Sequence, residues 1–292
     1  MRYKLSAPAT LHTTIQLPAS KSISNRALIL HALAQGHIAP SNLSDCDDTR
    51  VMIKALDGNP GHIDILAAGT AMRFLTAYLS VTPGTRIITG TERMQQRPIR
   101  ILVDALRELG AQIEYAGKEG FPPLRITGTE LTGEEISLAG NVSSQYISAL
   151  LMIGPILKNG LRLNLTGEII SRPYINLTLQ LMKEFGADAA WSSKSSITVR
   201  PGKYRDIPFT VESDWSGASY WYQMVALIQD NEKKESTKTE IKLPGLLPRS
   251  YQGDSRGAEI FAKLGVHTTY TDQGVILTKM GTPVTCLKDC RA

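Results

Sequence analysis

The sequence predicts an α/β (α+β) fold built from repeated βαβαββ units around buried helices. The first observation is a segment that occurs three times, in which the end of an amphipathic helix is followed by a glycine and then by a strand that ends on an aromatic residue. The glycines are Gly110, Gly186 and Gly265, and they lie 76 and 79 residues apart. The second observation is a short strand closed by a further glycine 20, 19 and 20 residues before each of them. Helix–glycine–strand segments are common in α/β proteins, but chance does not readily give such constant spacing, so we interpret the pattern as a structural repeat.

Each repeat consists, in order, of a leading helix, a strand, a second helix that ends at the C-cap glycine, and two further strands. The leading helices are expected to start near Gly69, Ser143 and Ser216. The expected strands, in order within each repeat, are 87–90, 112–115 and 124–126; 163–167, 188–191 and 197–199; and 241–245, 267–270 and 275–277. With a leading strand added, each repeat becomes a βαβαββ unit.

A fourth, earlier copy is expected before these three. Its leading helix starts in the stretch from Ser20 to Arg26. The helix–glycine motif is less well preserved in this copy and is represented by Gly58, and the next strand is expected at about 61–66. Segments 27–33 and 149–153, which belong to leading helices, are apolar on nearly every side. This pattern is typical of a helix enclosed by other elements.

Length and composition describe an ordinary globular protein with room for two domains. The chain has 292 residues, a net charge of +5 and no block rich in lysine and arginine, which favours small anionic ligands over nucleic acid. No apolar run reaches membrane-spanning length, and residues 1–4 are not followed by the apolar region of a signal peptide. The cysteines, Cys46, Cys286 and Cys290, are too few for a disulfide framework and have no histidine cluster beside them, so we expect a cytoplasmic protein without a metal site.

The stretch from Ser20 to Arg26 has the composition of a helix start that binds an anion. Ser20 or Ser22 can cap free backbone N–H groups, Lys21 adds a compact cation, and Arg26 adds a planar fork one turn later. Small or hydroxyl residues also start the other leading helices, at 69–70, 143–144 and 216–219. If pseudo-symmetry relates these helices, their N-termini emerge on one face and form a pocket for more than one anion. The alternative is that these residues are only helix caps, which explains Ser143-Ser144-Gln145 poorly.

A second group of candidates follows the glycine-closed strands. Arg97 precedes Pro98 at a helix start, where a positive side chain is locally unfavourable, so an anion is the better reason for its presence. Ser171 and Tyr174 occupy the corresponding region of the next repeat. Taken singly, their alternative roles are capping and core packing.

Five motifs, in the order of the chain, resemble the successive signatures of the 5-enolpyruvylshikimate-3-phosphate synthase family. They are Ser20-Lys21-Ser22-Ile23-Ser24-Asn25-Arg26, Ala68-Gly69-Thr70-Ala71-Met72-Arg73, Arg93-Met94-Gln95-Gln96-Arg97-Pro98-Ile99, Val142-Ser143-Ser144-Gln145-Tyr146 and Ser171-Arg172-Pro173-Tyr174. Tyr251-Gln252-Gly253-Asp254 resembles a further element, and the match extends to about Lys279. Five motifs in register are far more specific than any one of them.

The resemblance implies a metal-free transferase without a cofactor. Such an enzyme moves the enolpyruvyl group of phosphoenolpyruvate to the 5-hydroxyl of shikimate 3-phosphate and releases phosphate, on the way to chorismate and the aromatic amino acids. The implied fold is the two-domain enolpyruvyl transferase fold of repeated βαβαββ units, with small-molecule substrates between the domains. We expect no nucleic-acid partner and a monomer.

The resemblance also assigns roles to individual residues. Lys21 would touch both substrates and assist proton transfer as the catalytic residue, and Gly69 and Arg97 would bind phosphoenolpyruvate. The residues implied for shikimate 3-phosphate are Ser22, Arg26 (on its carboxylate), Ser143, Ser144 and Ser171 (on its phosphate), Gln145 (between the substrates) and Tyr174 (near the ring). The family usually has a proline where Phe74 stands, beside the phosphoenolpyruvate loop.

The chain does not contain several later family segments. These are an aspartate base, a K-E-x-D-R segment, a D-H-R segment and a late lysine. We therefore expect a continuous substrate-binding domain at 19–213, with three repeats, and an incomplete second domain made of 1–18 and 214–292 that exposes apolar surface. Activity of this shortened chain is expected to be slow or absent, because acid–base chemistry needs the carboxylates.

Alternative functions stay open at this point. A truncated, non-catalytic remnant that binds shikimate 3-phosphate fits the short chain. The second alternative is the related UDP-N-acetylglucosamine enolpyruvyl transferase, which carries a reactive cysteine in a loop. Here Cys46 is the one cysteine outside the tail, and the residues at 20–26 favour the shikimate enzyme.

Overall fold

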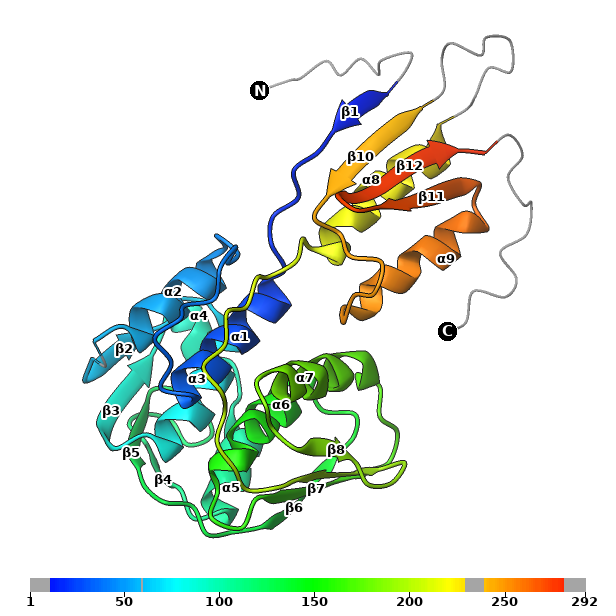
Figure 1. The fold of residues 1–292 in the computed structure, drawn as a ribbon. Helices are drawn as coiled ribbons and strands as arrows, with labels where there is room; N and C mark the ends of the chain where they lie inside the picture. Colours follow the sequence, from blue (N-terminus) through cyan, green and yellow to red (C-terminus); the bar gives the residue numbers. More distant parts are fainter. Residues whose placement is uncertain (1–10, 59, 229–238, 281–292) are drawn as a thin grey trace. The chain divides into compact units, whose positions relative to one another are not determined.

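The structure is a computed structural model that describes residues 11–58, 60–228 and 239–280 (Figure 1). The chain divides into two compact units, one formed by Lys21–Val211 and the other by Met1–Ser20 together with Glu212–Ala292. These bounds differ by two residues at each end from the expected division at 19 and 213. Residues 1–4, Cys286 and Cys290 lie outside the described residues.

The unit Lys21–Val211 contains two four-stranded sheets of identical topology. In the first, the strand order is β2-β3-β5-β4, and in the second it is β6-β7-β9-β8. The first sheet consists of β2 (His62–Asp64), β3 (Gly84–Thr89), β4 (Gln112–Tyr115) and β5 (Leu124–Gly128), and the second of β6 (Glu135–Ala139), β7 (Leu161–Thr166), β8 (Ala189–Trp191) and β9 (Ser196–Val199). In both sheets the leading strand pairs in parallel with its neighbour, and the other pairs are antiparallel.

Two helices connect the strands of each sheet as the repeat predicts. They are α3 (Gly69–Val81) and α5 (Arg100–Glu108) in the first copy, and α6 (Ser144–Ile153) and α7 (Arg172–Glu184) in the second. A short helix α4 (Glu92–Gln95) follows β3, and a 3₁₀ turn η1 (Gly154–Ile156) follows α6. Both copies are therefore βαβαββ units, and the prediction of the repeat is confirmed.

The third copy forms the other unit (Figure 1). Its elements are β1 (His12–Thr14), α8 (Trp215–Leu227), β10 (Glu240–Pro244), η3 (Gly253–Arg256), α9 (Gly257–Ala262), β11 (Val266–Thr271) and β12 (Gly274–Lys279). The sheet order is β1-β10-β12-β11, and β1 pairs in parallel with β10. Trp215 and Tyr222 of α8 pack on Leu243 and Leu277 of this sheet to form the core.

The three C-cap glycines predicted from the repeat all have the left-handed backbone that ends a helix. Their φ angles are 104° at Gly110, 89° at Gly186 and 78° at Gly265. Residues with a Cβ rarely adopt this conformation, and this is why glycine recurs at the same step of each copy.

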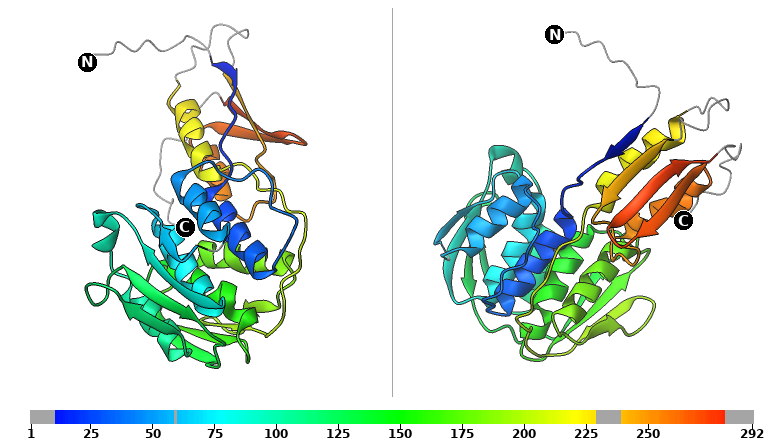
Figure 2. Two further views of the ribbon diagram at one scale, coloured as in Figure 1. Left: turned by 90° about the vertical axis from the view of Figure 1, so that its left-hand side faces the viewer. Right: turned by 45° about the horizontal axis from the view of Figure 1, so that its top comes forward.

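The central helices of the larger unit are buried as predicted. Helix α3 buries 11 of its 13 residues and contacts α6 and α1 (Lys21–Leu33), and α1 also contacts α7. All of 149–153 is buried, whereas 27–33 is fully buried only as far as Leu30. Figure 2 shows these helices on the inner side of the two sheets.

The expected fourth copy differs from the structure in one respect. Helices α1 and α2 (Asp47–Leu56) form as a pair, but the strand expected to follow them is β2, which belongs to the first sheet. The register places the buried side chain of Ile63 beside that of Ile88 on β3. The strand is thus the leading strand of the next repeat, and α1 and α2 have no sheet of their own among the described residues.

Candidate active site

The start of α1 divides into an accessible part and a buried part. Lys21 is exposed and Ser22 is half-buried. Behind them, Ser24 Oγ accepts a hydrogen bond from the backbone N–H of Ser44 (2.9 Å), and Asn25 Oδ1 accepts one from Thr49 Oγ1 (2.8 Å). Ser24 and Asn25 therefore attach the following loop and α2 to α1, whereas Lys21 and Ser22 are the accessible positions of this helix start.

Arg26 lies in the interior of the unit, with 3% of its surface exposed. Its guanidinium donates to Thr178 Oγ1 (2.7 Å), to Ser148 Oγ (3.0 Å) and to the carbonyl oxygen of Ser22 (2.9 Å). Burial lowers the pKa of Arg26 to about 10, and the nearby Tyr174 opposes this shift. Arg26 therefore keeps its positive charge at neutral pH, and Tyr174 of α7 lies close enough to affect it.

The guanidinium of Arg97, a residue of the loop after α4, lies at the start of α3. A Cβ built on Gly69 would stand 2.5 Å from Nη1 of Arg97, which means that the guanidinium lies directly against the glycine. Free N–H groups at a helix start and a guanidinium together favour an anion. Gly69 and Arg97, both predicted to bind phosphoenolpyruvate, are thus brought together.

Arg73, one turn along α3, connects the start of this helix to the loop that carries Arg97. It donates through Nη1 to the carbonyl oxygen of Gly69 (2.9 Å) and through Nη2 to that of Pro98 (3.4 Å), and its guanidinium lies over the ring of Tyr146. Burial and the positive charge of Arg73 lower the pKa of Arg97. Two cations placed side by side attract an anion more strongly than either does alone.

The start of α6 joins the same region. Ser143 is the N-cap, and its Oγ accepts from the backbone N–H of Gln145 (3.3 Å). Gln145 Nε2 donates to Thr70 Oγ1 (3.1 Å), and the Tyr146 hydroxyl donates to the carbonyl oxygen of Pro98 (2.9 Å). The N-termini of α3 and α6 and the Arg97 loop therefore form one continuous site.

The start of α7 has a different local structure. Ser171 stands at the N-cap position, half-buried, and its side chain makes no capping bond. Arg172 lies 4.1 Å over the ring of Trp191, and Tyr174 is 41% exposed. Among the described residues, no side-chain hydrogen bond joins Lys21, Ser144 or Ser171 to another predicted site residue.

The EPSP synthase model, described as 3-phosphoshikimate 1-carboxyvinyltransferase, matches residues 5–58 and 59–290. The chain belongs to the EPSP synthase family. A 3-phosphoshikimate 1-carboxyvinyltransferase of Bacteroides fragilis is 71% identical over 284 residues, which cover 97% of this chain and 67% of the relative. The enzyme of the same name from Shewanella halifaxensis is 38% identical and covers 90% of this chain and 66% of the relative. The chain thus spans about two thirds of the length of the relatives it matches.

A solved structure supports the same fold. EPSP synthase from Acinetobacter baumannii matches with a TM-score of 0.75 and 20% sequence identity, over 94% of this chain and 66% of that one. The predicted family and the predicted enolpyruvyl transferase fold are confirmed. Nothing in these comparisons favours the UDP-N-acetylglucosamine enzyme.

Several contacts of the candidate site were not predicted from the sequence. Thr70, Arg73, Tyr146, Ser148 and Thr178 connect the predicted residues to one another. The one available signal was spacing, since Arg73, Ser148 and Thr178 follow Gly69, Ser144 and Tyr174 by one helical turn. Phe74 is fully buried, and its ring centroid lies 5.2 Å from the guanidinium carbon of Arg26.

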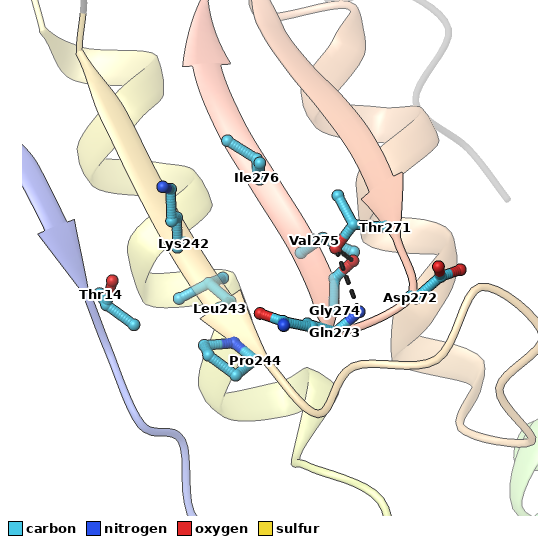
Figure 3. A pocket seen from close by; sticks show the side chains of 10 residues that line it. All are labelled: Thr14, Lys242, Leu243, Pro244, Thr271, Asp272, Gln273, Gly274, Val275 and Ile276. Atoms are coloured by element: carbon cyan, nitrogen blue, oxygen red, sulfur yellow. Dashed lines mark hydrogen bonds between the residues drawn. The ribbon is translucent and has the colours of Figure 1, made fainter.

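A hollow of about 390 Å³ lies in the unit that contains β1 and β10 (Figure 3). It is lined by Thr14, Lys242, Leu243, Pro244, Thr271, Asp272, Gln273, Gly274, Val275 and Ile276, none of which is a predicted site residue. Its one amine, Lys242 Nζ, is 3.4 Å from a carboxylate oxygen of Glu240. This hollow therefore adds nothing to the anion site built on α1, α3 and α6.

Among the described residues, no group of three or more histidine, cysteine, aspartate or glutamate side chains is placed to hold a metal ion. In the same ranges, every helix is too short or too polar to cross a membrane.

Proposed function

We propose that this chain carries the substrate-binding part of an enolpyruvyl transferase, which moves the enolpyruvyl group of phosphoenolpyruvate to the 5-hydroxyl of shikimate 3-phosphate and releases phosphate. The observation that carries the proposal is the convergence of Gly69, Arg97 and Gln145 at two helix N-termini. The relatives at 71% and 38% identity are named for this reaction.

Phosphoenolpyruvate is proposed to bind at the start of α3. Its carboxylate or phosphate would be held by the guanidinium of Arg97 and by free N–H groups of the helix start, with Arg73 adding positive charge behind them. Lys21, which is exposed at the start of α1, is proposed to reach both substrates and to transfer a proton.

Shikimate 3-phosphate is proposed to bind across the starts of α1, α6 and α7. Ser143, Ser144 and Ser171 would donate hydroxyl groups to its phosphate, with Ser171 making no capping bond that competes. Arg26 would contact its carboxylate, supported by Ser22. Gln145 would lie between the substrates and Tyr174 near the ring.

The chain on its own is proposed to bind shikimate 3-phosphate and to turn over slowly. The sequence contains no K-E-x-D-R or D-H-R segment, and the acid–base step needs such carboxylates. Calorimetric titration with shikimate 3-phosphate and a phosphate-release assay with both substrates test the two parts separately. Absence of binding overturns the proposed function, and rapid phosphate release overturns the proposed slow turnover.

A matched pair of variants tests the anion site. Arg97→Gln removes the guanidinium at Gly69 and should abolish measurable phosphoenolpyruvate binding. Arg125→Gln removes the same charge from an exposed position on β5 and should leave binding within about twofold. Equal losses in the two variants would mean that net charge, and not the site, attracts the ligand.

We also propose that the protein acts as a monomer in the cytoplasm. The chain has only three cysteines in 292 residues, too few for a disulfide framework, and this supports a reducing compartment. Sedimentation velocity at several concentrations tests the monomer, and a concentration-dependent dimer contradicts it.

A further inference from the structure

Arg26 is a buried cation without a buried acid beside it. Among the described residues, its side chain contacts two hydroxyl groups, a backbone carbonyl oxygen and the ring of Phe74. No ion pair among the described residues includes Arg26. Burying a charge without a partner of opposite charge is unfavourable, so this arrangement needs a reason.

The two hydroxyl groups are arranged as a pair. Ser148 Oγ and Thr178 Oγ1 lie 2.8 Å apart, and they accept from Nη2 and Nε of Arg26 respectively. An arginine presents Nε and Nη2 as a fork that fits the two oxygens of a carboxylate. Here two neutral oxygens from different helices, α6 and α7, occupy the places that a carboxylate would take.

The protons of this pair can be assigned by counting donors. Each hydroxyl has one O–H donor and two acceptor positions. Thr178 donates its proton to the carbonyl oxygen of Tyr174 (2.9 Å), so the proton between the two hydroxyl groups must come from Ser148. Thr178 then accepts from both Ser148 and Arg26, which saturates it. The chain of donation runs from Arg26 through Ser148 and Thr178 to the backbone of α7.

This chain fixes the plane of the guanidinium without reducing its charge. These hydrogen bonds use three of the five N–H groups of Arg26, and the remaining two belong to Nη1 and Nη2. An acidic partner would hold the side chain equally well but would neutralise it, and would then compete with an anionic ligand.

We propose that Ser148 and Thr178 form a neutral clamp that orients Arg26 and leaves its full positive charge for the carboxylate of shikimate 3-phosphate. Both are positioning residues, since they act through Arg26. This inference rests on the proposed function, which supplies the anionic ligand.

Thr178→Val tests the clamp because valine matches threonine in shape and removes the oxygen. The titrations use this chain with shikimate 3-phosphate and with cyclohexyl phosphate, which has a ring and a phosphate but no carboxylate. Thr178→Val should weaken binding of shikimate 3-phosphate about 10-fold and change that of cyclohexyl phosphate by less than about twofold, because only the carboxylate depends on Arg26. Thr178→Ser restores the oxygen and should restore binding of shikimate 3-phosphate.

Ser148→Asp separates orientation from charge. It supplies a real carboxylate to Arg26, so the protein should remain folded, while binding of shikimate 3-phosphate should fall by at least about 10-fold. A variant that binds shikimate 3-phosphate as tightly as the wild type overturns the proposal. If Ser148→Asp does not fold, the comparison of Thr178→Val with Thr178→Ser decides the question alone.

A readout without ligand distinguishes the clamp from the proposed function. In NMR spectra of the unliganded chain, the Nε–H of Arg26 should exchange slowly with solvent in the wild type and in Thr178→Ser, and rapidly in Thr178→Val. Slow exchange together with no binding of shikimate 3-phosphate by the wild type means that the proposed function fails although the contacts exist. Equal weakening of both ligands in Thr178→Val means that the hydroxyl groups only support the fold, and it overturns the proposal.

Discussion

The guanidinium of Arg97 occupies the space that a side chain at Gly69 would need. A Cβ built on Gly69 would lie 2.5 Å from Nη1, 2.8 Å from Nη2 and 2.9 Å from Cζ of Arg97. Real Cβ atoms do not approach other heavy atoms so closely, so any larger residue at this position must displace the guanidinium. Arg97 is exposed at the end of a flexible side chain, and its displacement costs the fold little.

Gly69→Ala should therefore weaken anion binding without weakening the fold. We expect about 10-fold lower affinity for phosphoenolpyruvate, because one charge-assisted contact is moved out of place. The free energy of unfolding should change by less than about 1 kcal/mol, since Gly69 has no positive φ and alanine suits a helix. Calorimetric titration and urea unfolding measure the two effects.

Gly217→Ala is the matched control for this substitution. Gly217 lies in the first turn of α8, and a Cβ there meets its nearest atoms at 3.8 Å, an ordinary contact distance. Phosphoenolpyruvate affinity should not change in this variant. If it falls as much as in Gly69→Ala, displacement of Arg97 is not the cause.

The Tyr146 hydroxyl connects α6 to the Arg97 loop. Tyr146→Phe removes the bond to the carbonyl oxygen of Pro98 and leaves that oxygen to the weaker contact with Arg73. We expect a loss of about 1 kcal/mol in the free energy of unfolding and weaker phosphoenolpyruvate binding. Tyr115→Phe serves as the comparison, because the Tyr115 hydroxyl is buried and has no partner among the described residues. Its removal should be neutral or stabilising, so destabilisation of the same size in both variants contradicts the role given to Tyr146.

Local requirements made much of the fold predictable. A glycine is needed where a helix ends in the left-handed conformation, and Gly110, Gly186 and Gly265 mark that step in each copy. The place of β2 was not predictable in the same way. A strand of three residues carries too little pattern to reveal its neighbour, and its pairing with β3 depends on how the whole repeat closes.

The site shows the same division between local and distant contacts. Arg97 could be selected from the sequence because a cation at a helix start conflicts with the helix dipole unless an anion is present. The partners of Arg26 could not, because Ser148 and Thr178 lie 122 and 152 positions away in the chain. Single hydroxyl residues inside apolar helices most often bond to the preceding turn, and nothing local distinguishes these two from that case.

The two units should differ in their resistance to protease. Helix α3 of the larger unit buries 11 of its 13 residues, whereas α8 of the other unit buries four of 13 and leaves Tyr220 67% and Leu227 73% exposed. Limited digestion should leave a fragment bounded near Ala19 and Ser213, identified by mass spectrometry. Equal survival of both sides of Ser213 contradicts this expectation.

The buried carboxyl group of Glu212 should give the smaller unit a distinctive pH dependence. Only 9% of Glu212 is exposed, and its Oε1 accepts from Ser250 Oγ. Burial raises the pKa of Glu212 above its ordinary value of 4.5, and the charge of Asp214 acts in the same direction. The folded state therefore holds a proton that the unfolded state has released, so stability falls as the pH rises from about 4.5 through the raised pKa.

Glu212→Gln removes this titration and keeps an oxygen that can accept from Ser250. We expect the wild type to lose stability as the pH rises from about 4.5 through the raised pKa of Glu212, and the variant to lose less over the same range. Asp214, whose pKa is also raised by burial, is present in both proteins, so the part of its contribution that does not depend on the charge of Glu212 cancels in the comparison. A Trp191→Phe background leaves Trp215 and Trp221 as the fluorescent probes, both on α8, so that urea unfolding reports on this unit alone. Parallel pH profiles for the two proteins would contradict this expectation. They would show that ionisation of Glu212 costs no stability, because its contacts compensate for its burial.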